Sequence, residues 1–116
     1  MKIRTAVFMA ALSAGGFAAR ASSSADNAPE LVERFQCMGC HAADKVTIGP
    51  TFQQIATRWR GKPGAEQALA ATIRRGSKAT DGPHWGQVKM PDDAEREQIG
   101  EKQARWIARW ILRQQP

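Results

Sequence analysis

The chain has 116 residues, of which 42% are hydrophobic, and its mean hydropathy is −0.47. This length suits a single domain, and no apolar run is long enough to remain in a membrane, so we expect no stable membrane insertion. The net charge of +6 would by itself suit a nucleic-acid-binding protein. Three of the 17 basic residues, however, lie in an N-terminal export segment, and the sequence contains no nucleic-acid-binding motif, so we exclude that partner.

The N-terminal segment has the three parts of a secretory signal peptide. Lys2 and Arg4 form a charged start, residues 5–12 form an apolar segment, and small residues follow. The small residues allow cleavage after Ala21 or as late as after Ala25. An uncleaved anchor helix is the alternative, but the apolar segment is shorter than the roughly 20 residues that span a bilayer. We therefore predict export to the bacterial periplasm.

Cleavage would divide the chain into three parts. We predict a signal peptide at residues 1–21, a flexible N-terminal lead at residues 22–28 and one domain at residues 29–116. The lead is a polar stretch without periodicity, which is typical of an unstructured terminus. No repeat and no second boundary follows it, so the remaining residues form a single folding unit.

Helical periodicity recurs along the domain, and no segment has the alternation of a strand. A first short helix is predicted to begin near Pro29, because proline fits the first turn, and to run into the cysteine motif. Apolar residues at helical spacing indicate a second helix and a last helix, and an alanine-rich run that ends before Gly76 indicates a third. These three helices are expected at about 52–59, 65–75 and 94–113. Residues 77–92 have no period and predict an irregular loop.

The residues Cys37-Met38-Gly39-Cys40-His41 form the C-x-x-C-H signature of covalent haem attachment. On one helical turn, two cysteines at this spacing reach the two vinyl groups of one porphyrin, and the next residue directs its imidazole at the iron. The export signal strengthens this interpretation, because haem c is attached in the compartment that an exported chain reaches. We therefore predict one covalent haem c, bound through Cys37 and Cys40.

Three other interpretations of the cysteines have less support. A thioredoxin-like dithiol would need a surrounding β-α-β pattern, which the sequence lacks. A zinc site needs four ligands, and His84 is the only other strong candidate in the chain. A disulfide between Cys37 and Cys40 would close too small a loop to stabilise the fold much and would leave His41 without a role.

Further short motifs follow the cysteine motif in a fixed order. They are Ile48-Gly49-Pro50, Gly64-Ala65-Glu66, Ile73 to Ser77, Trp85-Gly86, Met90-Pro91 and Trp106. In this order and spacing, the whole mature chain resembles the small class I bacterial cytochromes c of the cytochrome c-551/c-552 type. The resemblance implies an all-α cytochrome c fold, with about four short helices wrapped around one covalently attached haem.

The axial ligands of the iron are predicted to be His41 and Met90. Met90 is the only methionine that lies outside both the signal peptide and the attachment turn. It follows the irregular loop, which lets the chain pass over the porphyrin and return on the face opposite His41. Two neighbours compete with it as distal ligands. His84 adjoins a tryptophan that is expected to face the haem edge, and Lys89 competes only under alkaline conditions.

The resemblance also implies roles for residues around the iron. The backbone carbonyl of Pro50 would accept a hydrogen bond from the far ring nitrogen of the proximal histidine, which fixes the ring. Trp85 would reach a haem propionate, and Trp106 would pack in the core against the haem side. The chain departs from the family pattern in its longer segment at residues 78–84 and at positions 72, 92 and 93. Thr72 replaces a basic residue that commonly holds a propionate, and Asp92 stands where relatives have a second proline.

Two protein ligands leave no open iron site for a substrate, which favours electron transfer over catalysis. We therefore predict a monomeric periplasmic carrier of single electrons that is not an enzyme. A dedicated haem subunit of a larger dehydrogenase or reductase, acting as its electron outlet, is the alternative. A gas-binding or peroxidatic haem protein is a third interpretation, and it would require an open distal site.

Basic residues suggest how redox partners would dock. One group recurs every four residues and forms a basic stripe on the last predicted helix, namely Arg105, Arg109 and Arg113. A second group flanks the predicted haem crevice, namely Lys45, Lys78 and Lys89. Both groups would suit a partner protein with an acidic docking surface, and an ordinary solvated surface is the alternative for both.

Overall fold

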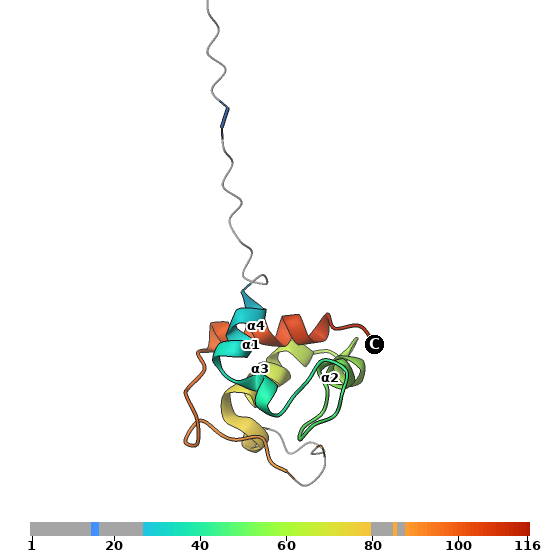
Figure 1. Ribbon diagram of the computed structural model, residues 1–116, viewed down its shortest axis with the longest axis vertical. Helices are drawn as coiled ribbons and strands as arrows, with labels where there is room; N and C mark the ends of the chain where they lie inside the picture. The colour runs from blue at the N-terminus through green and yellow to red at the C-terminus, as the bar shows by residue number, and fades with distance from the viewer. Residues whose placement is uncertain (1–14, 17–26, 80–84, 86–87) are drawn as a thin grey trace, which may run out of the picture.

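The computed structural model describes residues 15–16, 27–79, 85 and 88–116 (Figure 1). Apart from Gly15 and Gly16, the predicted signal peptide lies outside the described residues, as do most of the lead and His84. Within the described residues the fold is all α, as predicted, and contains no strand. Its elements are α1 (Ala28–Arg34), η1 (Cys37–Gly39), α2 (Phe52–Trp59), α3 (Ala65–Arg75), η2 (Gly76–Ala79) and α4 (Glu101–Leu112), where η marks a 3₁₀ helix.

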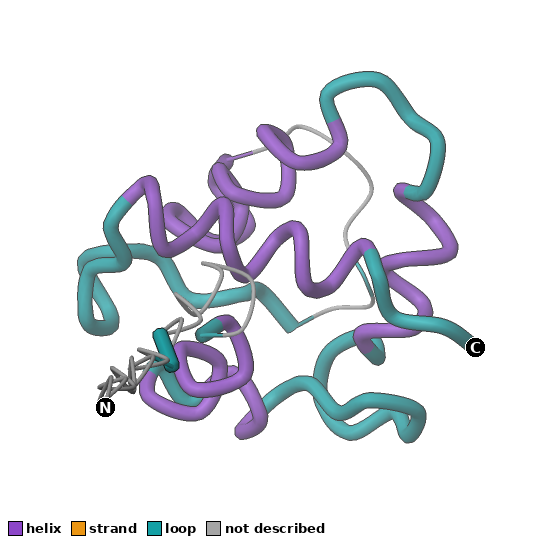
Figure 2. The backbone as a smooth tube through the Cα atoms, turned by 90° about the horizontal axis from the view of Figure 1, so that it is seen from above, coloured by secondary structure: helices purple, strands orange, loops and turns teal. Residues whose placement is uncertain are grey.

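The C-terminal helix α4 organises the core, because it packs against α1, α2 and α3. Figure 1 shows α4 as the orange to red ribbon across the domain, and Figure 2 shows the helices and their connecting loops from above. Each helix turns its apolar face toward this centre, as their periodicity predicts. The buried core consists of Leu31, Val32, Phe52, Ile55, Leu69, Ala70, Ile73, Ile99, Ala104, Ile107, Ala108 and Ile111.

Helix α2 begins at a capping box that sequence analysis did not identify. The hydroxyl of Thr51 accepts a hydrogen bond from the backbone N–H of Gln54 at 3.0 Å, and the Gln54 side chain accepts one from the backbone N–H of Thr51 at 2.9 Å. These bonds satisfy donors that the first turn of a helix leaves free. The cap sets the start of α2, so that Phe52 enters the core at 2% exposure.

Helix α1 ends earlier than predicted. It stops at Arg34 and does not run into the cysteine motif, because Gln36 adopts a left-handed conformation with φ of 56°. A residue in this conformation cannot continue a right-handed helix. The cysteine motif therefore begins on a separate 3₁₀ turn, η1.

Helix α4 begins at Glu101, later than the predicted start at Ala94. The residues before it form a turn, in which the backbone N–H of Ala94 donates to Oδ1 of Asp92 at 2.9 Å. Gly100 is extended, and its N–H donates to the Gln103 side chain at 3.2 Å, which places the start of the helix after it. The sequence pattern suggested a longer helix because Ile99 falls at helical spacing from the apolar residues of α4. Ile99 is indeed buried, but it lies in the segment before the helix.

Candidate functional site

The cysteine motif forms a tight turn in which the backbone N–H groups of Cys40 and His41 both donate to the carbonyl of Cys37, at 3.2 Å and 3.0 Å. Both thiols are free and half-buried. Burial raises the pKa of the Cys37 thiol, and the positive charge of Arg96 partly opposes this effect. The turn thus carries two unpaired thiols and one imidazole within a single short segment, which is the arrangement that covalent haem attachment requires.

The His41 ring is held on one side by the next loop. Its Nδ1 lies 2.7 Å from the carbonyl oxygen of Pro50, which is the hydrogen bond that the family resemblance implies. With Nδ1 donating to this carbonyl, the lone pair of the neutral ring resides on Nε2, where a metal would bind. A Cβ atom at Gly49 would lie 2.9 Å from Cε1 of His41, so only glycine allows this approach.

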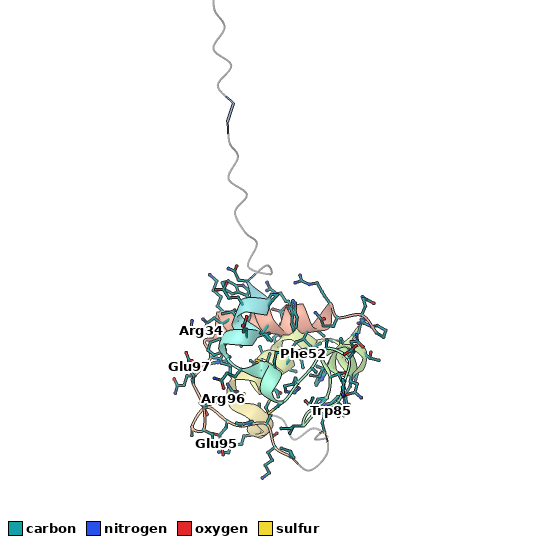
Figure 3. The ribbon with its side chains drawn as sticks, viewed as in Figure 1. Arg34, Phe52, Trp85, Glu95, Arg96 and Glu97 are labelled. Carbon is teal, nitrogen blue, oxygen red and sulfur yellow. The ribbon has the colours of Figure 1, made fainter. Side chains whose placement is uncertain are left out.

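An aromatic chain supports His41 from the core. The Phe52 ring stacks on the His41 ring at 5.7 Å between centroids, and Trp110 meets Phe52 edge to face at 5.1 Å. Figure 3 shows Phe52 near the middle of the domain, below α4. The tryptophan of α4 that supports the histidine is therefore Trp110. Trp106, for which the resemblance implied packing in the core, is partly buried against the core, and Lys102 lies over its ring.

A cavity of about 320 Å³ opens beside His41. Both His41 and Met90 line it, although they lie far apart in the sequence, and most of its walls are apolar. The walls come from loops, α2 and α3, and include Ile48, Pro50, Ile55, Trp59, Leu69, Trp85, Val88 and Pro91. An apolar cavity that joins one imidazole, one thioether and an adjacent free thiol fits a haem, since these are groups that hold haem iron and its vinyl substituents.

The methionine segment is held against the end of α3 by two hydrogen bonds. The backbone N–H of Met90 donates to the hydroxyl of Ser77 at 2.8 Å, and the N–H of Ser77 donates to the carbonyl of Met90 at 3.1 Å. Both bonds act on the backbone of Met90, the residue whose side chain is predicted to be the distal ligand. Sequence analysis did not identify Ser77 as part of the site, because nothing local indicates that the two segments meet.

Charged side chains hold the residues that follow Met90. Nε of Arg96 donates to the carbonyl of Pro91 at 3.0 Å, and its Nη2 donates to the carbonyl of Ile73 at the end of α3. Asp92 is 6% exposed and pairs with Lys78, whose ammonium group, together with backbone N–H donors, holds the pKa of the Asp92 carboxyl below its usual range. At the position where the resemblance implied a second proline, this chain therefore has a buried carboxylate in an ion pair.

Gly76 allows the methionine segment to lie directly on the end of α3. Its φ is +63°, and a Cβ atom there would overlap the carbonyl oxygens of Met90 and Pro91. We expect Gly76→Ala to lower the free energy of unfolding by about 2 to 4 kcal/mol, because both the conformation and the contact become unfavourable. Urea unfolding of the holoprotein measures this loss.

Gly61 provides the matched control for that substitution. Its φ is +76°, but a Cβ atom there would meet nothing within 4 Å. Gly61→Ala should therefore cost only the left-handed conformation, about 1 kcal/mol. Equal losses in the two variants would show that the contact with the methionine segment has no energetic importance.

Trp85 is half-buried and lines the cavity, and Figure 3 shows it at the lower right of the domain. The guanidinium carbon of Arg58 lies 4.8 Å from the centre of its ring. Thr72 also lines the cavity from α3, but its hydroxyl is bonded to the carbonyl of Ala68 at 3.2 Å. The predicted aromatic residue is thus at the cavity, together with an arginine that sequence analysis did not single out.

The basic stripe of α4 is largely neutralised within the chain. Arg105 pairs with Glu101 at 3.0 Å and Arg109 with Glu66 at 2.9 Å. The bond from Arg109 lowers the pKa of Glu66. Of the residues predicted to flank the crevice, Lys89 lines the cavity and is exposed, whereas Lys78 is engaged by Asp92. Two of the three arginines of the predicted stripe are therefore paired within the chain, whereas Lys89 forms no ion pair among the described residues.

Comparisons with known proteins agree with this geometry. The sequence model of the family described as cytochrome c matches residues 25–115. Cytochrome c-551 of Pseudomonas aeruginosa is 32% identical over 90 residues, which cover 78% of this chain and 79% of that protein. Cytochrome c-552 of Nitrosomonas europaea is 32% identical over 83 residues, which cover 72% and 74%.

Solved structures show the same arrangement of helices. The crystal structure of wild-type Nitrosomonas europaea cytochrome c552 superposes with a TM-score of 0.64 at 29% identity, and the match covers 75% of this chain and 99% of that one. The class 1 cytochrome MtoD of Sideroxydans lithotrophicus superposes with a TM-score of 0.52 at 27% identity, and the match covers 75% of this chain and 91% of that one.

Among the residues that our structure describes, no helix is long and apolar enough to cross a membrane.

Proposed function

This chain belongs to the cytochrome c family, whose members carry covalent haem c, and we propose that it is a periplasmic monohaem electron carrier with His41 and Met90 as the axial ligands of its iron. The observation that carries the proposal is the cavity that His41 and Met90 both line. Cys37 and Cys40, on the turn that leads into His41, would provide the two thioether bonds. When bound, the haem supplies the one-electron iron couple.

The residues around the cavity would limit structural change during electron transfer. The Pro50 carbonyl holds the His41 ring from one side, and Ser77 holds the backbone of Met90 from the other. With both ligands held in place, little reorganisation is needed when an electron arrives or leaves. Apolar walls and a methionine ligand both favour the reduced state and raise the potential.

Redox partners would approach the rim of the cavity. Ile48 and Val88 line the cavity and are 54% and 63% exposed, and Lys62 and Lys89 line the same cavity and are also exposed. Exposed apolar side chains beside lysines suit brief contact with a partner that carries acidic residues around an apolar centre. We therefore assign docking to this rim rather than to the arginines of α4.

The same exposed apolar side chains also suit the second candidate function, an electron-outlet subunit bound to a larger oxidoreductase. Size-exclusion chromatography of the natively purified protein separates the two. A free monomer supports the carrier, and persistent elution with a larger protein supports the subunit.

The carrier function predicts a closed iron site. The reduced protein should exchange electrons rapidly with soluble mediators and should bind no carbon monoxide near pH 7, because both axial positions are filled. Stopped-flow absorbance measures both properties in one preparation. Rapid carbon monoxide binding by the unmodified protein would instead indicate an open distal site and a gas-binding or peroxidatic function.

A further inference from the structure

The walls of the cavity carry positive charge only. Three cationic residues line it, namely Arg58, Lys62 and Lys89, and no acidic residue does so among the residues described. Haem carries two propionate carboxylates, and a carboxylate near an apolar cavity needs a cationic or hydrogen-bonding partner. Thr72 lines the cavity but supplies no charge, and its hydroxyl proton is directed at the carbonyl of Ala68. Among the described residues, the candidates to bind a propionate are therefore these three cations.

Arg58 differs from the two lysines in burial and in orientation. Arg58 is half-buried, whereas Lys62 and Lys89 are exposed. Its guanidinium group lies over the ring of Trp85 at 4.8 Å, which leaves the N–H groups at its edge free for an acceptor. No carboxylate among the described residues forms an ion pair with it. The ammonium group of Lys62 instead lies over Trp59, 5.5 Å from the ring centre.

We propose that Arg58, stacked on Trp85, binds a haem propionate from α2 and takes the place of the cationic residue that α3 lacks at Thr72. A guanidinium group can bind a carboxylate through two parallel hydrogen bonds, which a lysine cannot do. The indole N–H of Trp85, which lines the same cavity, is a second hydrogen-bond donor for the propionate. The proposal rests on the haem site described above and does not depend on which residue is the distal ligand.

The test is a potentiometric titration of the holoprotein between about pH 5 and pH 9. A propionate that titrates in this range makes the reduction potential depend on pH, because its charge interacts with the iron. A cation at hydrogen-bond distance lowers the pKa of a carboxylate by about 1 to 3 pH units. In Arg58→Gln the pKa of the redox-linked group should therefore rise by that amount, and in Arg58→Lys it should rise by less.

Two matched variants complete the experiment. Arg60→Gln removes a nearby exposed arginine that bonds to the carbonyl of Gln114 and does not line the cavity, so its titration should match that of the wild type. Lys62→Gln removes the competing cation and should also leave the titration unchanged. An unchanged curve in Arg58→Gln, or a shift in Lys62→Gln alone, would overturn the assignment.

The outcome of the titration can be distinguished from a failure of the proposed iron ligation by His41 and Met90. The weak far-red band from sulfur to oxidised iron reports on the methionine ligand, and it should be retained in all four variants. If this band is absent from the wild type, the His41 and Met90 assignment fails, whereas the titration still reports on Arg58. If the band is present and the Arg58→Gln curve equals that of the wild type, only the propionate assignment fails.

Discussion

Replacement of both Cys37 and Cys40 by alanine is expected to leave no covalent haem in the exported protein. These are the only cysteines of the chain, and they lie on the turn beside the cavity. The domain is also small, so its own core stabilises the fold only marginally, and apolar contacts with the haem should add to that stability. Loss of the haem should therefore lower the stability of the fold. Little stable holoprotein should therefore accumulate.

Haem staining of a denaturing gel, combined with the mass of the purified chain, measures this loss. Met38→Ala is the control, because Met38 lies inside the same motif, is 53% exposed and supplies no thiol. It should retain the full amount of covalent haem. Undiminished staining in the double cysteine variant would refute thioether attachment at these residues.

Replacement of Met90 by alanine is expected to remove the far-red band of the oxidised protein and to open the iron to carbon monoxide. The reason is that the cavity places this thioether on the same apolar walls as His41, while the bonds from Ser77 hold its backbone. Without the sulfur, water or carbon monoxide can occupy the distal position. The reduced variant should bind carbon monoxide rapidly, whereas the unmodified protein should not bind it.

Variants of the neighbouring residues identify the ligand. Lys89→Ala, which removes an exposed lysine next to Met90, should retain the band and exclude carbon monoxide near pH 7. His84→Ala should do the same, although His84 lies outside the described residues. If the unmodified protein lacks the band and His84→Ala opens the iron, the protein is a cytochrome with two histidine ligands and a lower potential.

Much of this architecture follows from local signals. Helix α3 has the predicted bounds, 65–75, and α2 covers the predicted apolar stripe from Phe52 to Trp59, because apolar spacing and the glycine after Arg75 act over a few residues. The C-x-x-C-H signature is equally local, and so was enough to predict the covalent haem that the family carries. The start of α4 was not predictable in this way, because a buried Ile99 produces helical spacing in a segment that is not helical.

The sequence by itself determined the all-α class, the places of two of the helices and the attachment motif, and the resemblance implied the bond between Pro50 and His41. Only the tertiary structure decided how the segment that carries Met90 is anchored and which cation lies over Trp85. The bond from Arg96 to Ile73 spans 23 positions of sequence, and Arg58 approaches Trp85 only after the chain has folded back on itself. Such contacts have no period and no fixed spacing, so they arise from packing and cannot be derived from local pattern.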